Sequence, residues 1–308
     1  MIGTQLDLFA DWHAAQAVVA QVAARSPGGG PQLDLFGDRN LQLEHARRAL
    51  AEARTRDACG ELVRLHRCFP EDATIAAELD LARRLEQRLV EIEAAFPGER
   101  PRLYLALAHA ATATATAAVR TALLRRAAGE LRRQGPEALL DGKPASVLWL
   151  AAGDAEAASA AAADAVRHSP RARFLAYLAD VEHRLDHRTR ARELYRQALA
   201  LDPTDVDWDE LADDDVRALP DIARTELELA DGVAWAAPVG VVLGVLPIGD
   251  PPGDGATDPQ SASELDRARR FLGALGRATR TRGPSMIEAR REMRALAPQL
   301  LAAYLERR

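Results

Sequence analysis

The sequence predicts an all-α protein, and two observations carry this prediction. Apolar residues recur at helical spacing over most of the 308 residues, for example from Arg39 to Leu50. Proline and glycine interrupt this pattern at short intervals, as at Pro70 and Pro203, which is typical of consecutive helices joined by tight turns. The abundance of alanine agrees with a helical fold. This observation counts for less, because the overall composition is biased: Lys143 is the only lysine, beside many arginines.

The first 38 residues are predicted to form an extended arm that carries one helix and a linker. Asp11 can cap a helix over residues 11–25, and the sequence Ser-Pro-Gly-Gly-Gly-Pro at 26–31 favours a flexible connection. The string Gln-Leu-Asp-Leu-Phe occurs twice in this arm, at residues 5–9 and 32–36. An identical five-residue string that recurs after 27 residues is improbable by chance, so the two copies indicate a shared role.

Residues 39–233 are predicted to be a series of helices separated by short breaks. Asp38 can cap the first of them, which we expect to start near Arg39. The predicted helices cover residues 39–55, 57–68, 72–95, 102–133 (one helix or two), 145–152, 155–168, 171–185, 188–201 and 209–231, the last with a break at Pro220. Alanine and threonine alternate over residues 110–118, but the high helix propensity of alanine and the flanking helical segments favour a helix there.

Residues 234–308 are predicted to form a C-terminal helical cap rather than an independent domain. The apolar stretch at 234–248 fits a buried helix or a strand, and its periodicity does not decide between them. Glycine, proline and aspartate over residues 249–263 predict a flexible loop. Two amphipathic helices, over residues 263–280 and 285–306, are expected to close the chain.

Composition and charge argue against several classes of function. A net charge of −6 and a pI of about 5.7 argue against direct binding to nucleic-acid phosphates. The N-terminus lacks the basic and apolar regions of a signal peptide, and the stretch at 234–248 is shorter than the ~20 apolar residues that span a membrane. Cys59 and Cys68 have no Cys-x-x-Cys spacing and are expected to be reduced. We therefore expect a cytoplasmic protein without membrane or direct nucleic-acid contact.

Residues 172–205 resemble a tetratricopeptide (TPR) repeat, a helical hairpin of 34 residues. The residues that carry the resemblance fill the positions where the two helices pack: Leu178, Ala179, Ala191, Tyr195 and Ala198, with Pro203 ending the second helix. Glu182 departs from the family, which prefers an aromatic residue there. Residues 39–72 fit the same frame loosely. The resemblance implies a TPR-like α-solenoid of antiparallel helix pairs, because such repeats bury their apolar faces only when neighbours stack.

The repeated string resembles the peptide by which polymerases, mismatch-repair proteins and other partners dock on the bacterial replication sliding clamp. That family pattern is Gln, Leu, a small or acidic residue, Leu, Phe, and both copies match it at all five positions. By resemblance the peptide lies extended in a groove of the clamp, where glutamine binds a polar subsite and Leu-Phe fills an apolar pocket. The implied partner-binding residues are Gln5, Leu6, Leu8 and Phe9 in the first copy and Gln32, Leu33, Leu35 and Phe36 in the second. The resemblance implies a non-enzymatic adaptor that docks on the clamp.

Two other interpretations of the repeated string stay open: packing on the protein itself, and binding to a partner other than the clamp. The second copy directly precedes a predicted helix, so Leu35 or Phe36 could pack on that helix as a hydrophobic staple. The chain would then be a general TPR scaffold whose arm packs on its own body or on another copy. About 15 helical residues and a short linker separate the copies and span roughly 45 Å, so simultaneous docking on one clamp is also left open.

Other motifs give weaker indications. His183 and His187 have the i, i+4 spacing of a zinc pair, but no third ligand is indicated and a solvent-facing helix end is the simpler interpretation. The segment Asp205–Asp209 begins like a calcium loop but lacks the required glycine and the bidentate glutamate. No catalytic constellation is recognisable in the sequence, although such a site could assemble in space near residues 234–248. We therefore expect no metal, no cofactor and no enzymatic activity.

Overall fold

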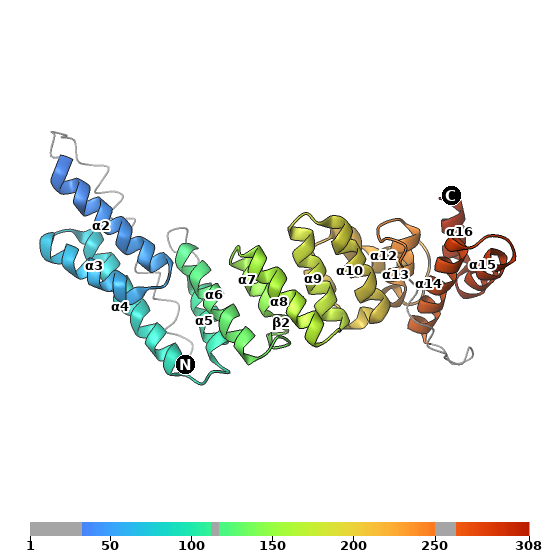
Figure 1. The fold of residues 1–308 in the computed structure, drawn as a ribbon, viewed down its shortest axis with the longest axis horizontal. Coiled ribbons are helices and arrows are strands. Elements are labelled where there is room, and N and C mark those ends of the chain that lie inside the picture. Colours follow the sequence, from blue (N-terminus) through green and yellow to red (C-terminus); the bar gives the residue numbers. More distant parts are fainter. Residues whose placement is uncertain (1–32, 112–116, 250–262, 308) are drawn as a thin grey trace. The chain divides into compact units, whose positions relative to one another are not determined.

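The computed structural model describes residues 33–111, 117–249 and 263–307, with side chains described from residue 39 onward. The chain divides into two compact units, Met1–Asp154 and Ala155–Arg308. Helices dominate the described residues of both units, and their only strands are two residues long each (Figure 1). The prediction of an all-α protein is therefore confirmed.

The first unit consists of helices that pack mainly on their neighbours along the chain. They are α2 (Leu33–Ala51), α3 (Thr55–Cys68), α4 (Ala73–Ala94), α5 (Arg100–Ala110), α6 (Ala117–Gln134) and α7 (Ala145–Ala151). Helix α3 lies between α2 and α4, α6 packs on α5 and α7, and α2 also contacts α6. The sequence did not predict the short antiparallel hairpin of β1 (Leu139–Leu140) and β2 (Lys143–Pro144) that precedes α7.

Leucine and alanine form the core of the first unit. Leu62 of α3, Leu85 of α4 and Leu123 of α6 are fully buried in one apolar cluster that spans α2 to α7. The small side chains of Ala46 and Ala58 have no exposed area, consistent with the close packing of α2 on α3. The helical spacing of these positions is what the sequence pattern predicts.

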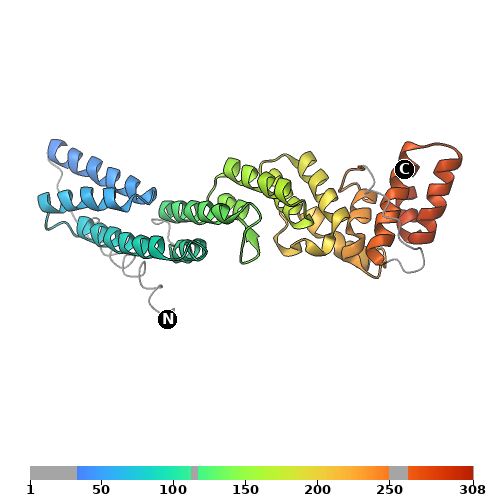
Figure 2. The ribbon, with the colours of Figure 1, turned by 60° about the horizontal axis from the view of Figure 1, so that its bottom comes forward.

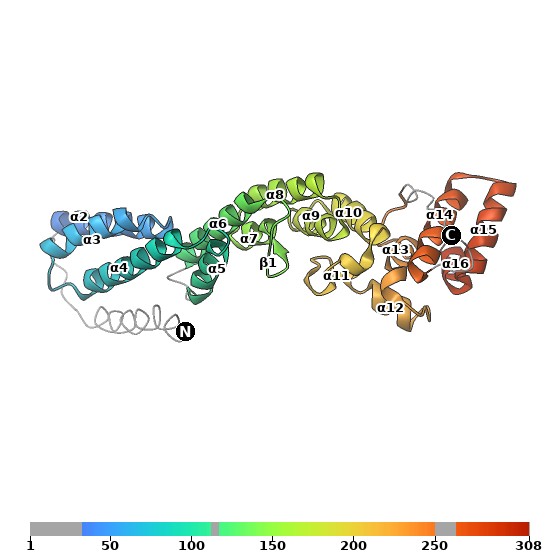
Figure 3. The same cartoon turned by 90° about the horizontal axis from the view of Figure 1, so that it is seen from below.

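The second unit also consists mainly of helices (Figures 2 and 3). Two short 3₁₀ turns lie among them. Its elements are α8 (Ala155–His168), α9 (Ala172–Arg184), α10 (Arg188–Leu201), η2 (Pro203–Asp205), η3 (Trp208–Glu210), α11 (Asp214–Arg217), α12 (Leu219–Thr225), α13 (Gly232–Val242), α14 (Glu264–Arg280), α15 (Pro284–Leu296) and α16 (Pro298–Glu306). Helices α9 and α10 form a tight hairpin, and α14, α15 and α16 pack in sequence order at the end of the unit.

Helix α13 is the centre of the second unit and settles the ambiguous apolar stretch as a helix. Ten of its eleven residues are buried, including Pro238 inside the helix. The indole of Trp235 meets the ring of Phe271 edge-on, with 5.9 Å between ring centroids, and its Nε1–H donates to Glu264 Oε2 over 2.7 Å. Residues before and after residue 234 share one core, so the C-terminal segment packs on the preceding helices instead of forming a core of its own.

Several predicted boundaries differ from the structure. Helix α2 begins at Leu33, six residues before the predicted start near Arg39. The predicted helix at 209–231 is replaced by η3, α11 and α12, and the one at 285–306 is divided at Ala297, the residue before Pro298. The predicted helix at 11–25, the middle of the Ala-Thr run and most of the loop at 249–263 lie outside the described residues. None of the described helices is both long and apolar enough to cross a membrane.

Candidate functional site

The two Gln-Leu-Asp-Leu-Phe copies are placed differently by the structure. The first copy, residues 5–9, lies outside the described residues, and so does Gln32 of the second copy. The backbone of residues 33–36 belongs to α2 and forms its first turn. The expectation that the whole segment up to residue 38 is extended therefore does not hold for residues 33–38, whose backbone is helical. The structure does not bring the two copies together at one described site.

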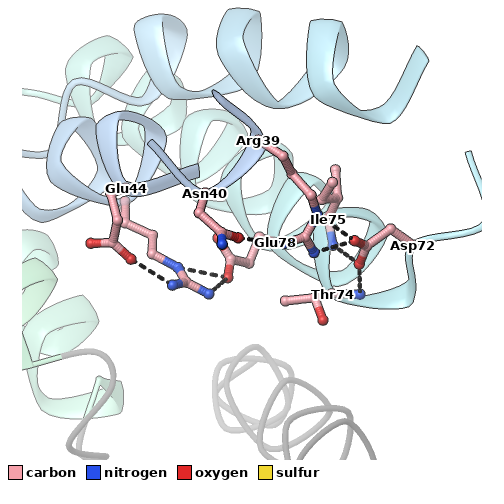
Figure 4. A network of polar contacts seen from close by, with 8 residues as sticks. Arg39, Asn40, Glu44, Asp72, Thr74, Ile75 and Glu78 are labelled. Carbon is pink, nitrogen blue, oxygen red and sulfur yellow. Dashed lines mark hydrogen bonds and ion pairs between the residues drawn. The ribbon is translucent and has the colours of Figure 1, made fainter. Parts of the chain in front are cut away.

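From Arg39 onward, α2 is fastened to α4 by ion pairs (Figure 4). The guanidinium of Arg39 donates through Nε to Asp72 Oδ2 over 3.0 Å, and its Nη2 makes a second contact to the same oxygen. Asp72 is the N-cap of α4, where its Oδ1 accepts from the amides of Thr74 and Ile75 over 3.0 and 3.3 Å. One carboxylate thus caps α4 and holds α2, which fixes the start of this helix pair.

A second pair lies two turns further along α2. Arg47 donates to Glu78 Oε1 through Nε over 3.0 Å and through Nη2 over 2.6 Å, and its Nη1 donates to Glu44 (Figure 4). Leu43 and Ala46 are buried between these contacts. Arg39 and Arg47 therefore join α2 to α4 at two positions that are two helical turns apart.

The two carboxylates of this network respond differently to their surroundings. Burial tends to raise the pKa of Asp72, but hydrogen bonds from Arg39 and from the amides of Ile75 and Thr74 outweigh it and hold the pKa below its usual value. Burial also raises the pKa of Glu78, and the partly exposed Arg47 offsets this only in part. Oε2 of Glu78 is buried without a hydrogen-bond partner in the described part of the chain, which agrees with the direction of this pKa shift.

In the second unit, each histidine of the pair lies beside a carboxylate. His187 Nδ1 lies 2.8 Å from Glu182 Oε2, and His183 Nδ1 lies 3.6 Å from Asp213 Oδ2. Arg192 adds a hydrogen bond of 3.2 Å to the buried Asp213. These contacts join the ends of α9 and α10 to the segment that leads into α11. In the described part of the chain, no three His, Cys, Asp or Glu side chains form a group that could hold a metal ion.

A buried carboxylate, Asp180, lies inside the α9–α10 hairpin. Its Oδ1 accepts both the hydroxyl of Tyr195 and the backbone amide of Ala212, the latter over 2.9 Å. Burial raises the pKa of Asp180 to about 6, although both hydrogen bonds act to lower it. Burial and the neighbouring carboxylate also raise the pKa of the Tyr195 hydroxyl. Asp180 thus ties the hairpin to residue 212, and its own pKa of about 6 lies close to neutrality.

The raised pKa of Asp180 predicts a pH-dependent stability. In the folded state Asp180 binds its proton more tightly than in the unfolded chain, so its stabilising contribution is complete in acid and is lost as the pH rises through about 6. The difference from 3.8 corresponds to about 3 kcal/mol at neutral pH. Asp180→Asn cannot ionise, and its side-chain oxygen can keep both hydrogen bonds. We expect this variant to lose the decline in the free energy of unfolding that the wild type shows between about pH 4 and pH 6.

Urea unfolding at a series of pH values, followed by Trp fluorescence and by hydrogen exchange of α9 and α10, measures this difference. Asp186→Asn is the matched control in the same hairpin, because Asp186 is exposed and has φ 61°, a conformation that asparagine tolerates. If both variants follow the wild-type pH profile, Asp180 does not hold an extra proton in the folded state.

Sequence reasoning missed these buried carboxylates. Asp180 and Glu182 lie on α9, a helix that is otherwise buried by apolar side chains over most of its length. Polar residues in such a helix are a signal for internal hydrogen bonds, because an unpaired buried carboxylate is costly. Their partners come from other segments, so spacing along the chain could not name them.

Comparison with protein-family models, with curated proteins and with solved structures gives no match for this chain.

Proposed function

We propose that this protein is a non-enzymatic adaptor that docks on the bacterial replication sliding clamp through its two Gln-Leu-Asp-Leu-Phe peptides. The observation that carries this proposal is the exact repetition of a string that matches the clamp-binding pattern at all five positions. A short peptide of this kind gains affinity from a few buried anchors, here Leu8 and Phe9 or Leu35 and Phe36. Such anchors need a chain segment that is free to adopt the extended shape that fits the groove of the clamp.

The rest of the chain would serve as a TPR-like scaffold that recruits a second protein. In support, α9 and α10 occupy residues 172–201 of the proposed repeat. The side chains expected to pack between its helices, Leu178, Ala179, Ala191, Tyr195 and Ala198, are all buried. Glu182, at the position where the family prefers an aromatic residue, is buried as well and shares a hydrogen bond with His187. The proposed scaffold thus replaces an aromatic contact with a polar one.

Docking of the second copy requires a change in α2, since its residues 33–36 form the first helical turn and the clamp groove takes an extended peptide. This change is small in free energy. Gly37 disfavours the helix by about 1 kcal/mol relative to alanine, and Asp38 can cap a shorter helix that starts at Arg39 for a gain of about 1 kcal/mol. The ion pairs from Arg39 and Arg47 to α4 would stay intact. Because the first turn of α2 must open before the second copy can dock, we expect this copy to bind more weakly than the first.

The alternative function is a general TPR scaffold without a clamp role, in which the arm packs on its own body or on another copy. The helical backbone of residues 33–36 favours this alternative for the second copy, because a peptide built into α2 has a structural use. It does not account for the first copy, which is separated from α2 by the Pro-Gly segment at 26–31.

Calorimetric titration of the full-length chain with a purified bacterial sliding clamp tests the proposal. Peptides with two buried anchors reach dissociation constants of about tens of micromolar, near −6 kcal/mol, so heat of binding is expected in that range. A titration that shows no binding at these concentrations would contradict clamp docking. Protection of residues 5–9 from hydrogen exchange in the free protein would then support the scaffold alternative.

A further inference from the structure

The first unit contains a hollow whose charge is opposite to that of the whole chain. The hollow has a volume of about 530 Å³ and lies between α2 and α3. Its charged walls are Arg48, Arg54, Arg56 and Arg64, beside Asp57 and Glu61. Between His45 and Cys68 the chain carries six arginines and three carboxylates, whereas the complete chain has a net charge of −6. Net charge alone therefore conceals a local cationic surface.

Among the described residues, two of the four arginines have a distant carboxylate partner or none. Arg54 and Arg64 are paired with nearby carboxylates, Asp57 over 2.6 Å and Glu61 over 3.0 Å. The exposed Arg48 has no side-chain partner among the described residues, and Arg56 reaches only Glu86, over 3.6 Å, with 80 % of its side chain exposed. Guanidinium groups that are exposed and weakly paired keep their donors available for an anion.

We propose that this hollow binds the sugar-phosphate backbone of a nucleic acid. Arg56 and Arg64 are eight residues apart on α3, which is about 12 Å along the helix axis. This distance is longer than one phosphate group. It equals the rise of about three nucleotides along one stacked strand, at ~3.4 Å per nucleotide. The planar guanidinium matches phosphate oxygens in a bidentate way. Successive phosphates suit cations that are spread along a helix better than a single small anion does.

The walls of the hollow disfavour a protein ligand. Ala49 is the one hydrophobic side chain among the lining residues, and Gly60 has none, so the hollow offers no pocket for the buried anchors on which peptide docking depends. Among the lining residues, the imidazole of His45 is the one aromatic ring on which a base could stack. Recognition would rest on charge, which is how proteins contact the nucleic-acid backbone without reading its sequence. The proposal departs from the expectation, based on net charge, that direct nucleic-acid contact is absent.

Fluorescence anisotropy of the full-length protein with a labelled single-stranded oligonucleotide of mixed sequence tests the proposal, without any clamp present. We expect a dissociation constant of about 10⁻⁴ to 10⁻⁶ M at moderate salt and a steep loss of binding as salt increases. Arg48→Glu with Arg56→Glu should weaken binding by about 10-fold or more and lower the salt slope by about 0.7 for each phosphate that an arginine no longer neutralises. Both arginines are exposed, so folding should be retained and is checked by circular dichroism.

The matched control is Arg291→Glu with Arg294→Glu, which makes the same charge change at two exposed arginines of α15 in the second unit. This control should change the affinity by less than about 3-fold, as expected for charges outside the contact region. Equal losses in both variants, or no binding by the wild type, would overturn the proposal. Binding of inorganic pyrophosphate without the oligonucleotide, or equal competition by polyglutamate, would also overturn it, in favour of a small phosphate ligand or an acidic peptide.

Discussion

Replacing Leu8, Phe9, Leu35 and Phe36 together with alanine is expected to abolish measurable binding of the sliding clamp. Each of these side chains would lose most of its buried apolar surface, worth about 1.5–3 kcal/mol. Loss of both anchors in a copy therefore removes at least about 3 kcal/mol, more than 100-fold in affinity, from an interaction that is only micromolar. Calorimetry against the wild-type chain measures this effect directly.

The same assay separates the two copies. Leu8→Ala with Phe9→Ala should weaken binding more than Leu35→Ala with Phe36→Ala, because the second copy docks only after the first turn of α2 has opened. Asp7→Ser is the control within the first copy, since the family pattern accepts a small residue there, and it should leave the affinity nearly unchanged. A larger loss from the second pair would mean that residues 33–36 are already available in solution.

The start of α2 shows how far sequence reasoning reaches in this protein. Asp38 is a good N-cap residue and Gly37 a poor helix residue, so local preferences place the start at Arg39. The structure instead begins the helix at Leu33. Two starts of similar free energy cannot be ranked from propensities of about 1 kcal/mol, because contacts elsewhere in the fold shift the balance. The helices α8, α9 and α10, which have strong periodicity between clear breaks, match their predicted ranges closely.

The polar contacts between distant segments could not be predicted from the sequence. Asp72 is recognisable in the sequence as the residue before a helix, but its partner Arg39 is 33 residues away and could not be chosen among the many arginines. The buried Asp180 likewise depends on Ala212, 32 residues further along the chain. Such contacts follow from the way helices stack, and stacking is not encoded in the spacing of any single helix. For the same reason the sequence alone did not indicate the hollow lined by arginines, which lies between the two helices α2 and α3.

Gly232→Ala is expected to destabilise the second unit by about 3 kcal/mol or more. Gly232 is the first residue of α13, and a Cβ atom added there would lie 2.1 Å from the backbone oxygen of Pro220 in α12. Real contacts of this kind are never so short, and neither partner can rotate away because both belong to the backbone. Either α12 must move away from α13, which opens the core around Trp235, or the start of α13 must distort. Both responses cost as much as severe overpacking of a core.

Gly129→Ala in α6 provides the matched control, because an added Cβ there meets no atom within 4 Å. In a helix interior the same substitution removes the flexibility of glycine and should stabilise the first unit by up to about 1 kcal/mol. Urea unfolding with hydrogen exchange resolved by segment measures the two units separately. The two glycines should therefore give shifts of opposite sign, one confined to α12 and α13 with their neighbours and one confined to α5, α6 and α7. If Gly232→Ala is as stable as the wild type, α12 and α13 do not approach through this glycine, and the central position of α13 in the core of the second unit must rest on its other buried residues.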